Sequence, residues 1–464
     1  MKTSRCACLA GVLLVMLPVS VRCQDSAATA DARRVLSSLL SAGMKERGAY
    51  ALLRELTREA PHRLSGSQGA ARAVRLVQRM MDSLGFANVH REDIAVPHWE
   101  RGAAERCTIV RSGARGIRLS VCALGGSVGT QTGGITAEVL EVRSFEELAR
   151  AGDTARGKII FFNRPMDASL VNTFEAYGGA VDQRFGGAAE AAKAGGVAAL
   201  VRSMTLADDD VPHTGVMGYR DGVRKIPTAA LGARSADRLS AMLHRSAMVT
   251  VRLVLRCQTL PDAPSANVVG EIAGSVHPEN VIVISGHLDC WDKGEGAHDD
   301  GAGCVQALEA LRLLQAAGVR PHQSIRVVLY MNEENGSRGG KGYAQDPRRE
   351  KENHVALMES DRGGFAPRGF TVDGDSSLLS RVMRWQSLFD AVGAGTITQG
   401  GGGADISPMA QKGIPCFGLL PENQRYFDYH HSDNDTLDKV NPRELELGAI
   451  VEALLAYLLS ESKI

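Results

Sequence analysis

The C-terminal half of the chain alternates short apolar runs with amphipathic stretches. Apolar runs of this length predict buried strands, and apolar residues three and four apart between them predict helices. Such an alternation is typical of an α/β fold with an open, mainly parallel sheet and helices on both faces. The predicted strands lie at 267–272, 281–284, 325–330, 355–358 and 414–420, and the predicted helices at 304–316, 377–391 and 444–459.

The N-terminal part contributes helices at 30–60 and 70–84, and strand-like runs at 89–96, 107–110 and 117–124. From residue 124 to 262, glycine clusters and alternating apolar positions predict an inserted β-rich domain, whose end is marked by Pro261 and Pro264. We therefore expect one α/β domain over 24–123 and 263–464, interrupted by an insertion over 124–262.

The first 23 residues differ from the rest. Lys2 and Arg5 precede an apolar run at 9–19, and a short stretch ends at Cys23. This is the layout of a secretory signal peptide, and the run is too short to span a bilayer comfortably, although a short membrane anchor would look similar. We expect a secreted protein, periplasmic in a bacterial source, with no membrane association beyond the signal peptide.

Charge and cysteine content narrow the function classes. Lys plus Arg and Asp plus Glu both number 53, and this balance predicts no nucleic-acid partner. Export permits disulfides. The six cysteines after residue 23 lack the pair spacing of a metal site. A hairpin disulfide between Cys107 and Cys122 and buried free thiols both fit the pattern.

Side chains of metal-ligand type follow four of the predicted strands. In open α/β sheets, ligands bind beyond the carboxyl ends of the strands. Any one of these residues alone fits a helix cap, a solvated turn or a satisfied core histidine, but their joint occurrence favours a metal site. The residues are His287, Asp289 and Asp299 after the second strand, Glu333 and Glu334 after the third, Asp361 after the fourth, and His431 after the last.

The residue types suggest how two divalent ions would be held. Two ions about 3.5–4 Å apart share a bridging carboxylate, and Asp299, in a glycine-lined turn, is the candidate bridge. His287 and Asp361 would complete one ion, and Glu334 and His431 the other. Two imidazoles and three carboxylates favour zinc.

Two further acids complete the predicted site. Glu333 adjoins a ligand and is free to act as the base that takes a proton from a metal-activated water and passes it to a leaving amine. Asp289, two residues after His287, fits a partner that orients the imidazole. The predicted chemistry is hydrolysis.

The surrounding motifs, SGHLDCWDKGEGAHDDGAG, MNEENGS, MESDRGG and YHHSDNDT, resemble the di-zinc exopeptidases of peptidase family 28. The similarity extends to HRLSGS, PHWERG, GITAEVLEV and DGVRKIPTA, and so covers nearly all of the mature chain. The resemblance implies the same five ligands, with Glu333 as general base and Asp289 as supporting acid. It also implies that His431 rather than His430 is the ligand.

Other implications of the resemblance concern architecture. It implies a cis peptide between Asp299 and Asp300, a protease-associated type of insertion, and a homodimer with the site near its interface. Cys290 departs from the family, which more often has a small hydroxyl residue there.

The resemblance favours carboxypeptidase action on dipeptides or short peptides with free termini. An aminopeptidase of the same family is the alternative, because the metal residues do not separate the two. A non-catalytic, receptor-like ectodomain is disfavoured by the complete set of ligands. Candidate contacts to a substrate terminus are Gly402 and Asp405, in a glycine run that also fits a mobile turn, and His213 and Tyr219 in the insertion.

Overall fold

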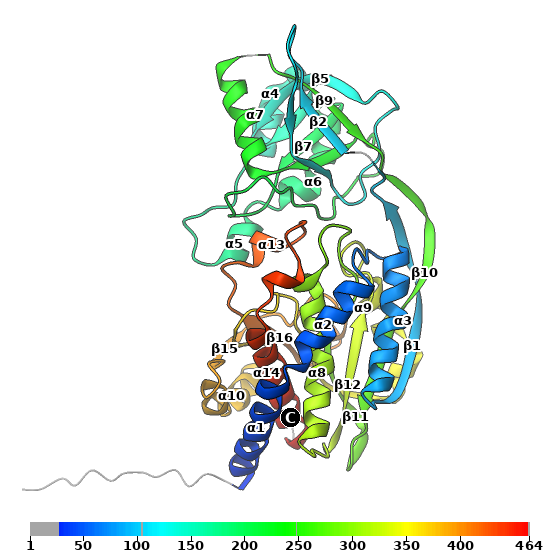
Figure 1. Cartoon of the computed structure of the whole chain (residues 1–464), viewed down its shortest axis with the longest axis vertical. Coiled ribbons are helices and arrows are strands. Elements are labelled where there is room, and N and C mark those ends of the chain that lie inside the picture. The colour runs from blue at the N-terminus through cyan, green and yellow to red at the C-terminus, as the bar shows by residue number, and fades with distance from the viewer. Residues whose placement is uncertain (1–26, 104, 247, 463–464) are drawn as a thin grey trace, which may run out of the picture.

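The computed structural model describes residues 27–103, 105–246 and 248–462 (Figure 1). The predicted signal peptide at 1–23 lies outside the described residues. Within those ranges, no helix combines the length and the apolar character needed to cross a membrane.

The larger of two sheets in the described chain has the strand order β1-β10-β12-β11-β13-β16-β14-β15. Its central strands β12, β11, β13 and β16 are parallel, and antiparallel strands flank them on both sides. The α/β fold with a mainly parallel sheet is therefore confirmed. The strands are β1 (Ala87–Glu100), β10 (Gln258–Ile272), β11 (His277–His287), β12 (Gln323–Tyr330), β13 (Asn353–Glu359), β14 (Pro367–Asp373), β15 (Thr396–Gln399) and β16 (Cys416–Pro421).

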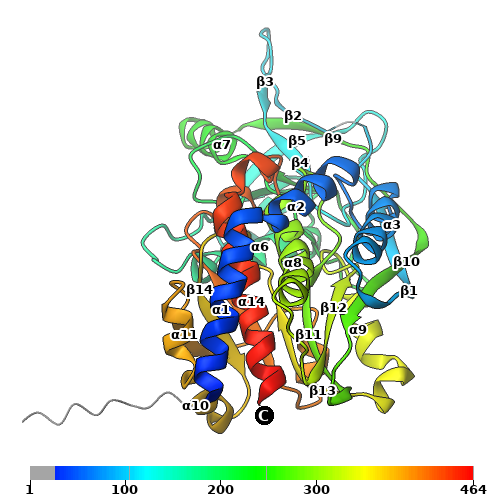
Figure 2. The ribbon, with the colours of Figure 1, turned by 60° about the horizontal axis from the view of Figure 1, so that its bottom comes forward.

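Both faces of this sheet are covered (Figure 2). In β11, Ile282 and Ile284 pack toward one face, and Val281 and Val283 toward the other, because successive side chains of a strand alternate. The first face is covered by α1 (Ala27–Glu46), α2 (Gly48–Glu59), α3 (Gln68–Ser83), α8 (Ala302–Ala316) and α14 (Pro442–Glu461), and the second by α9 (Arg338–Gln345) and α12 (Ser407–Ala410). Three shorter helices are α10 (Ser376–Met383), α11 (Gln386–Asp390) and α13 (Tyr426–Tyr429).

The second sheet has the order β3-β2-β9-β5-β6-β7-β8-β4, with β5 to β8 parallel. By strand pairing it begins at Glu105, before the predicted boundary at residue 124. Its strands are β2 (Glu105–Ile109), β3 (Ile117–Leu119), β4 (Val121–Ala123), β5 (Ile135–Val142), β6 (Ile159–Phe162), β7 (Ala198–Arg202), β8 (Thr228–Leu231) and β9 (Thr250–Leu255). Its helices are α4 (Phe145–Ala151), α5 (Thr173–Gly178), α6 (Asp182–Lys193) and α7 (Ala233–Arg245). We call residues 105–255 the second unit and the rest of the described chain the first unit.

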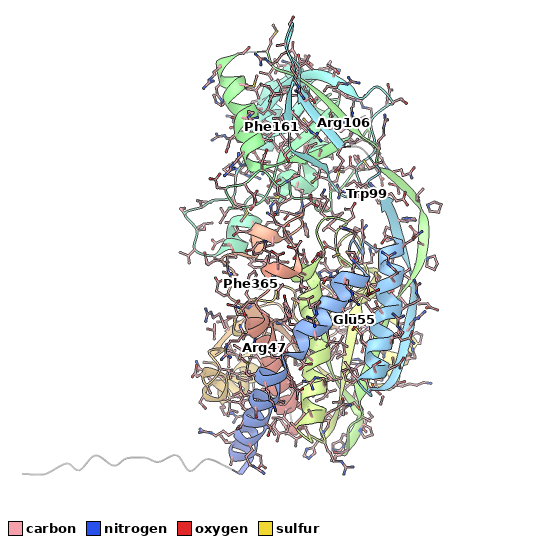
Figure 3. All side chains as sticks on the ribbon, viewed as in Figure 1. Arg47, Glu55, Trp99, Arg106, Phe161 and Phe365 are labelled. Carbon is pink, nitrogen blue, oxygen red and sulfur yellow. The ribbon has the colours of Figure 1, made fainter. Side chains whose placement is uncertain are left out.

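The chain enters and leaves the second unit through β1 and β10, which pair antiparallel over most of their length (Figures 1 and 3). Trp99, near the end of β1, donates a hydrogen bond to the Ser127 carbonyl at 2.9 Å and meets Trp291 edge to face. Arg101 pairs with Asp292 at 2.6 Å. The junction is thus held by apolar and ionic contacts. Cys107, Cys122 and the four other described cysteines are buried free thiols, so the structure holds no hairpin disulfide.

A buried acidic pair lies where α2, α8 and α14 meet. Glu446 accepts a hydrogen bond from the Ala49 amide at 3.1 Å and adjoins Glu309, which Arg312 binds at 2.6 Å. Burial first, and then the charge of Glu309, raise the pKa of Glu446 to about 8. The pair is therefore arranged to hold a proton at neutral pH.

This pair predicts a pH-dependent stability. Because the folded pKa of Glu446 is raised, its contribution is complete below the ordinary pKa and is lost as pH rises toward 8. We expect the unfolding free energy to fall between about pH 5 and 8 by up to about 1.4 kcal/mol per pH unit. In Glu446→Gln this component should vanish from urea unfolding curves. Glu55→Gln, on the exposed face of α2, should keep it; equal slopes in all three proteins would contradict the assignment.

Candidate metal centre

The order of the large sheet brings the predicted ligands together. Strands β12, β11, β13 and β16 are neighbours, so their carboxyl ends meet at one edge. His287 ends β11, Glu334 follows β12 and Asp361 follows β13. His431 follows α13, in the chain beyond β16, and Asp299 precedes α8. The peptide bond between Asp299 and Asp300 is cis, as the resemblance implied.

Asp299 lies between the two histidines. His287 Nε2 is 3.2 Å from Asp299 Oδ1 and 3.3 Å from Asp361 Oδ1. His431 Nε2 is 3.2 Å from Asp299 Oδ2 and 3.0 Å from Glu334 Oε2. Each oxygen of Asp299 therefore faces one imidazole, and each imidazole also contacts a second carboxylate: Asp361 for His287 and Glu334 for His431. This is the arrangement expected of a bridging ligand.

The donor set fits a cation. Asp299 and Glu334 are buried, and Asp299 Oδ2 and Glu334 Oε1 have no well-angled hydrogen bond to any described residue. Buried carboxylates are costly unless they are paired or coordinate a metal. Imidazole nitrogens and carboxylate oxygens together suit zinc and related divalent ions.

The electrostatics of the site also favour positive charge. Burial alone would lower the pKa of His431, but Glu334 and Asp299 outweigh it and raise that pKa to about 10. Burial likewise opposes the charged form of His287, yet Asp361 and Asp299 hold its pKa well above the usual value. Burial and the charge of Asp299 raise the pKa of Glu334 to about 7. Without a metal ion, these carboxylates are balanced by protons on the histidines and on Glu334. A bound metal ion supplies that positive charge instead.

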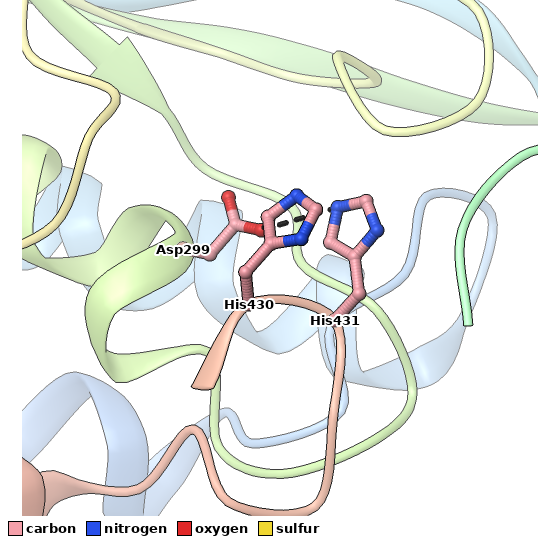
Figure 4. A group of neighbouring side chains, drawn as sticks. All are labelled: Asp299, His430 and His431. Carbon is pink, nitrogen blue, oxygen red and sulfur yellow. Dashed lines mark ion pairs between the residues drawn. The ribbon is translucent and has the colours of Figure 1, made fainter. Parts of the chain in front are cut away.

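His430 also approaches this site (Figure 4). Its ring stacks on that of His431 with centroids 3.5 Å apart, and its Nε2 is 3.8 Å from Asp299 Oδ2. Asp299, His430 and His431 could by geometry hold an ion together. His431 is closer to Asp299 and also contacts Glu334, so the geometry favours His431 as the ligand.

Asp289 acts on its surroundings in two ways. Its backbone oxygen lies 3.0 Å from His287 Nδ1, whereas its carboxylate is 3.9 Å away, so the main chain orients the imidazole. Its carboxylate accepts hydrogen bonds from the amides of Asn332 at 2.7 Å and Glu333 at 3.1 Å. Asp289 therefore holds the turn that presents Glu333. Burial, reinforced by Asp361 and Glu334, raises the pKa of the half-buried Glu333 well above its usual value.

Three supporting residues were not assigned from the sequence, although all three lie in motifs that it singled out. Asp300 accepts hydrogen bonds from the amides of His287 and Gly303, at 3.0 and 2.9 Å, and so ties β11 to α8. Asp435 accepts from the His298 and Asp299 amides, at 2.6 and 3.1 Å. Arg63, fully buried, donates to three carbonyls of the loop after β11.

The predicted substrate residues lie in different surroundings. The His213 ring donates to the His430 carbonyl at 2.7 Å and so adjoins the metal site. The hydroxyl of Tyr219 is bonded within the second unit, to Val128 and Ile226. Gly402 packs against β16, where a Cβ would lie 2.7 Å from Cys416. Asp405 is buried with both carboxylate oxygens unpartnered among the described residues.

Paired imidazoles and carboxylates around one bridging acid, at the carboxyl ends of parallel strands, define a metal-dependent hydrolase. Residues 267–457 match the model of peptidase family M28. The chain is 37% identical to carboxypeptidase Q of Bos taurus over 431 residues, covering 93% of this chain and 89% of that protein. The chain therefore belongs to peptidase family M28 and is a zinc metallo-exopeptidase similar to carboxypeptidase Q.

Solved structures agree with this membership. A peptidase M28 precursor from Shewanella amazonensis SB2B is 33% identical, superposes with a TM-score of 0.89, and covers 94% of this chain and 98% of its own. The zinc aminopeptidase of Bacillus subtilis is 18% identical, with a TM-score of 0.64 over 89% of this chain and 95% of its own, and shares the fold.

Removing the Asp289 carboxylate tests its supporting role. In Asp289→Ala the amides of Asn332 and Glu333 lose their acceptor, so we expect a loss of about 2–4 kcal/mol in unfolding free energy. Metal affinity should fall about 10–100-fold, which is the usual effect of removing a residue that supports the metal ligands. Urea unfolding and chelator competition measure the two effects. Asp262→Ala, which removes an exposed partner of Arg338, should change neither; effects no larger than this control would contradict the role.

Proposed function

We propose that the protein is an exported di-zinc exopeptidase that acts as a carboxypeptidase on dipeptides or short peptides with free termini. The observation that carries the proposal is Asp299, which faces His287 with one oxygen and His431 with the other. Similarity to carboxypeptidase Q along most of the chain supports the carboxypeptidase specificity.

The residues divide the chemistry among them. His287 and Asp361 would hold one zinc ion, Glu334 and His431 the other, and Asp299 both. When bound, such ions would supply a hydrolytic water whose pKa is lowered toward about 7. The Glu333 backbone amide donates a hydrogen bond to the Asp289 carboxylate, and the Glu333 side chain would take the proton of that water and deliver it to the leaving amine.

Export and assembly are part of the proposal. Export rests on the basic and apolar pattern of residues 1–23. A homodimer rests on the resemblance to the family. Light scattering of the purified protein distinguishes a dimer from a monomer, and the N-terminal residue of secreted material locates the cleavage.

An aminopeptidase of the same family is the second candidate, because the zinc aminopeptidase of Bacillus subtilis shares the fold and the metal residues do not separate the two activities. A receptor-like ectodomain without catalysis is disfavoured, since all five ligands and Glu333 are in place. A peptide panel with free or blocked termini, analysed by mass spectrometry, separates these functions. We expect cleavage that requires a free carboxyl terminus. Cleavage that depends on a free amino terminus alone would make the protein an aminopeptidase, and no cleavage with zinc bound would support the receptor.

Replacing the base separates binding of metal from turnover. Glu333→Gln should keep about two zinc ions per chain by mass spectrometry and lose about 10²–10⁴-fold in kcat, because proton transfer is removed while the ligands stay. Glu55→Gln is a matched exposed control. A near-normal rate would exclude Glu333 as the base, and one ion per chain would exclude the paired centre.

A further inference from the structure

Arg184 brings a cation from the second unit to the metal centre. It lies on α6, only 6% of its surface is exposed, and its Nη1 is 3.5 Å from Nδ1 of His431. Its guanidinium also lies over the ring of Tyr177, 5.5 Å from the centroid. The side chain therefore reaches across the junction to a predicted zinc ligand.

Arg184 differs from the other buried arginines of the described chain because its side chain contacts a ring nitrogen, His431 Nδ1, and no carbonyl or carboxylate oxygen there. Arg63 donates to three carbonyls, and Arg101, Arg326 and Arg349 pair with carboxylates. No carboxylate of residues 27–103, 105–246 or 248–462 lies within ion-pair distance of Arg184, and its Nε has no hydrogen-bond partner there. A buried charge without a partner is costly, so such a residue calls for an anion.

The Nδ1 atom of His431 likewise faces no carbonyl or carboxylate oxygen of the described chain. A histidine that binds metal through one ring nitrogen carries a proton on the other, which usually meets a carboxylate or carbonyl. The neighbour of His431 Nδ1 is instead the Arg184 Nη1, itself a donor. Two donors that face each other are satisfied together by one carboxylate that accepts from both.

The local backbone makes room for this arrangement. A Cβ on Gly215 would lie 2.4 Å from the Arg184 guanidinium, and Gly215 has a φ of 133°. The adjoining residue, Thr214, donates its amide to the His431 carbonyl at 2.9 Å. The glycine thus leaves space for the guanidinium at the point where the two units are bonded.

We propose that Arg184 binds the terminal carboxylate of the peptide substrate and so makes the enzyme a carboxypeptidase. This inference rests on the proposed function, because it assigns the residue that recognises the free carboxyl terminus. Arg184 comes from the second unit, whereas His431, the other ligands and the base come from the first.

The test compares peptides that differ only in their terminus. The best substrate from the panel and its C-terminal amide are assayed with wild type, Arg184→Met, Arg184→Lys and Arg220→Met. In Arg184→Met, kcat/KM for the free acid should fall on the order of 10²-fold, as when a buried charge pair is broken, and the amide should be unaffected. Arg184→Lys should recover part of the loss. Arg220→Met, which removes an exposed partner of Glu190 on the same helix, is the matched control.

A binding measurement keeps the inference separate from catalysis. Calorimetry with N-acetylglycine and N-acetylglycinamide on the zinc-loaded proteins should show a preference for the free acid that Arg184→Met abolishes while zinc content stays unchanged. If wild type cleaves no peptide yet shows this preference, the inference stands and the proposed function fails. Equal losses for acid and amide, a fall in zinc content, or no preference in wild type would overturn the inference.

Discussion

One carboxylate sets the spacing of the metal centre. Asp299 meets His287 from β11 on one side and His431 from the chain after β16 on the other. Its position is fixed by the hydrogen bond from its own amide to Asp435. The neighbouring Asp300 fixes the end of β11 to the start of α8. The geometry of the site is therefore carried by hydrogen bonds from main-chain amides at the end of β11 and around the start of α8 to buried carboxylates.

The second unit takes part in the site. His213 and Thr214 bond to the carbonyls of His430 and His431, so two consecutive carbonyls of the ligand loop are occupied from across the junction. Phe174 and Tyr177 stack on Tyr426 and Phe427 beside them. The hydrogen bonds and the buried or partly buried rings together fix the loop that carries His431.

Much of this arrangement could be predicted from the sequence. The central strands are buried on both faces and read as continuous apolar runs, and His287, Glu334 and Asp361 lie at or just after the ends of such runs. Asp299 and His431 lie farther along the chain, in the loops that follow. Strands β14 and β15 were missed because they lie toward the edge of the sheet and carry fewer apolar residues. The helix predicted at 377–391 is two helices, α10 and α11. Arg184 could not be recognised, since its burial arises only from the packing of the two units.

The pairing of β1 with β10 has a consequence for how the molecule is divided. Glu100 and Gln258 are partners across the ribbon, so the chain leaves the first unit and returns to it at neighbouring positions. Insertion of the second unit therefore leaves the large sheet unbroken. The entropy cost of closing the chain between Glu100 and Gln258 grows only slowly with the length of the insertion. Bond cleavage is thus assigned to the unit that holds the unbroken large sheet, and selection of the chain end to a residue of the inserted unit that packs against it.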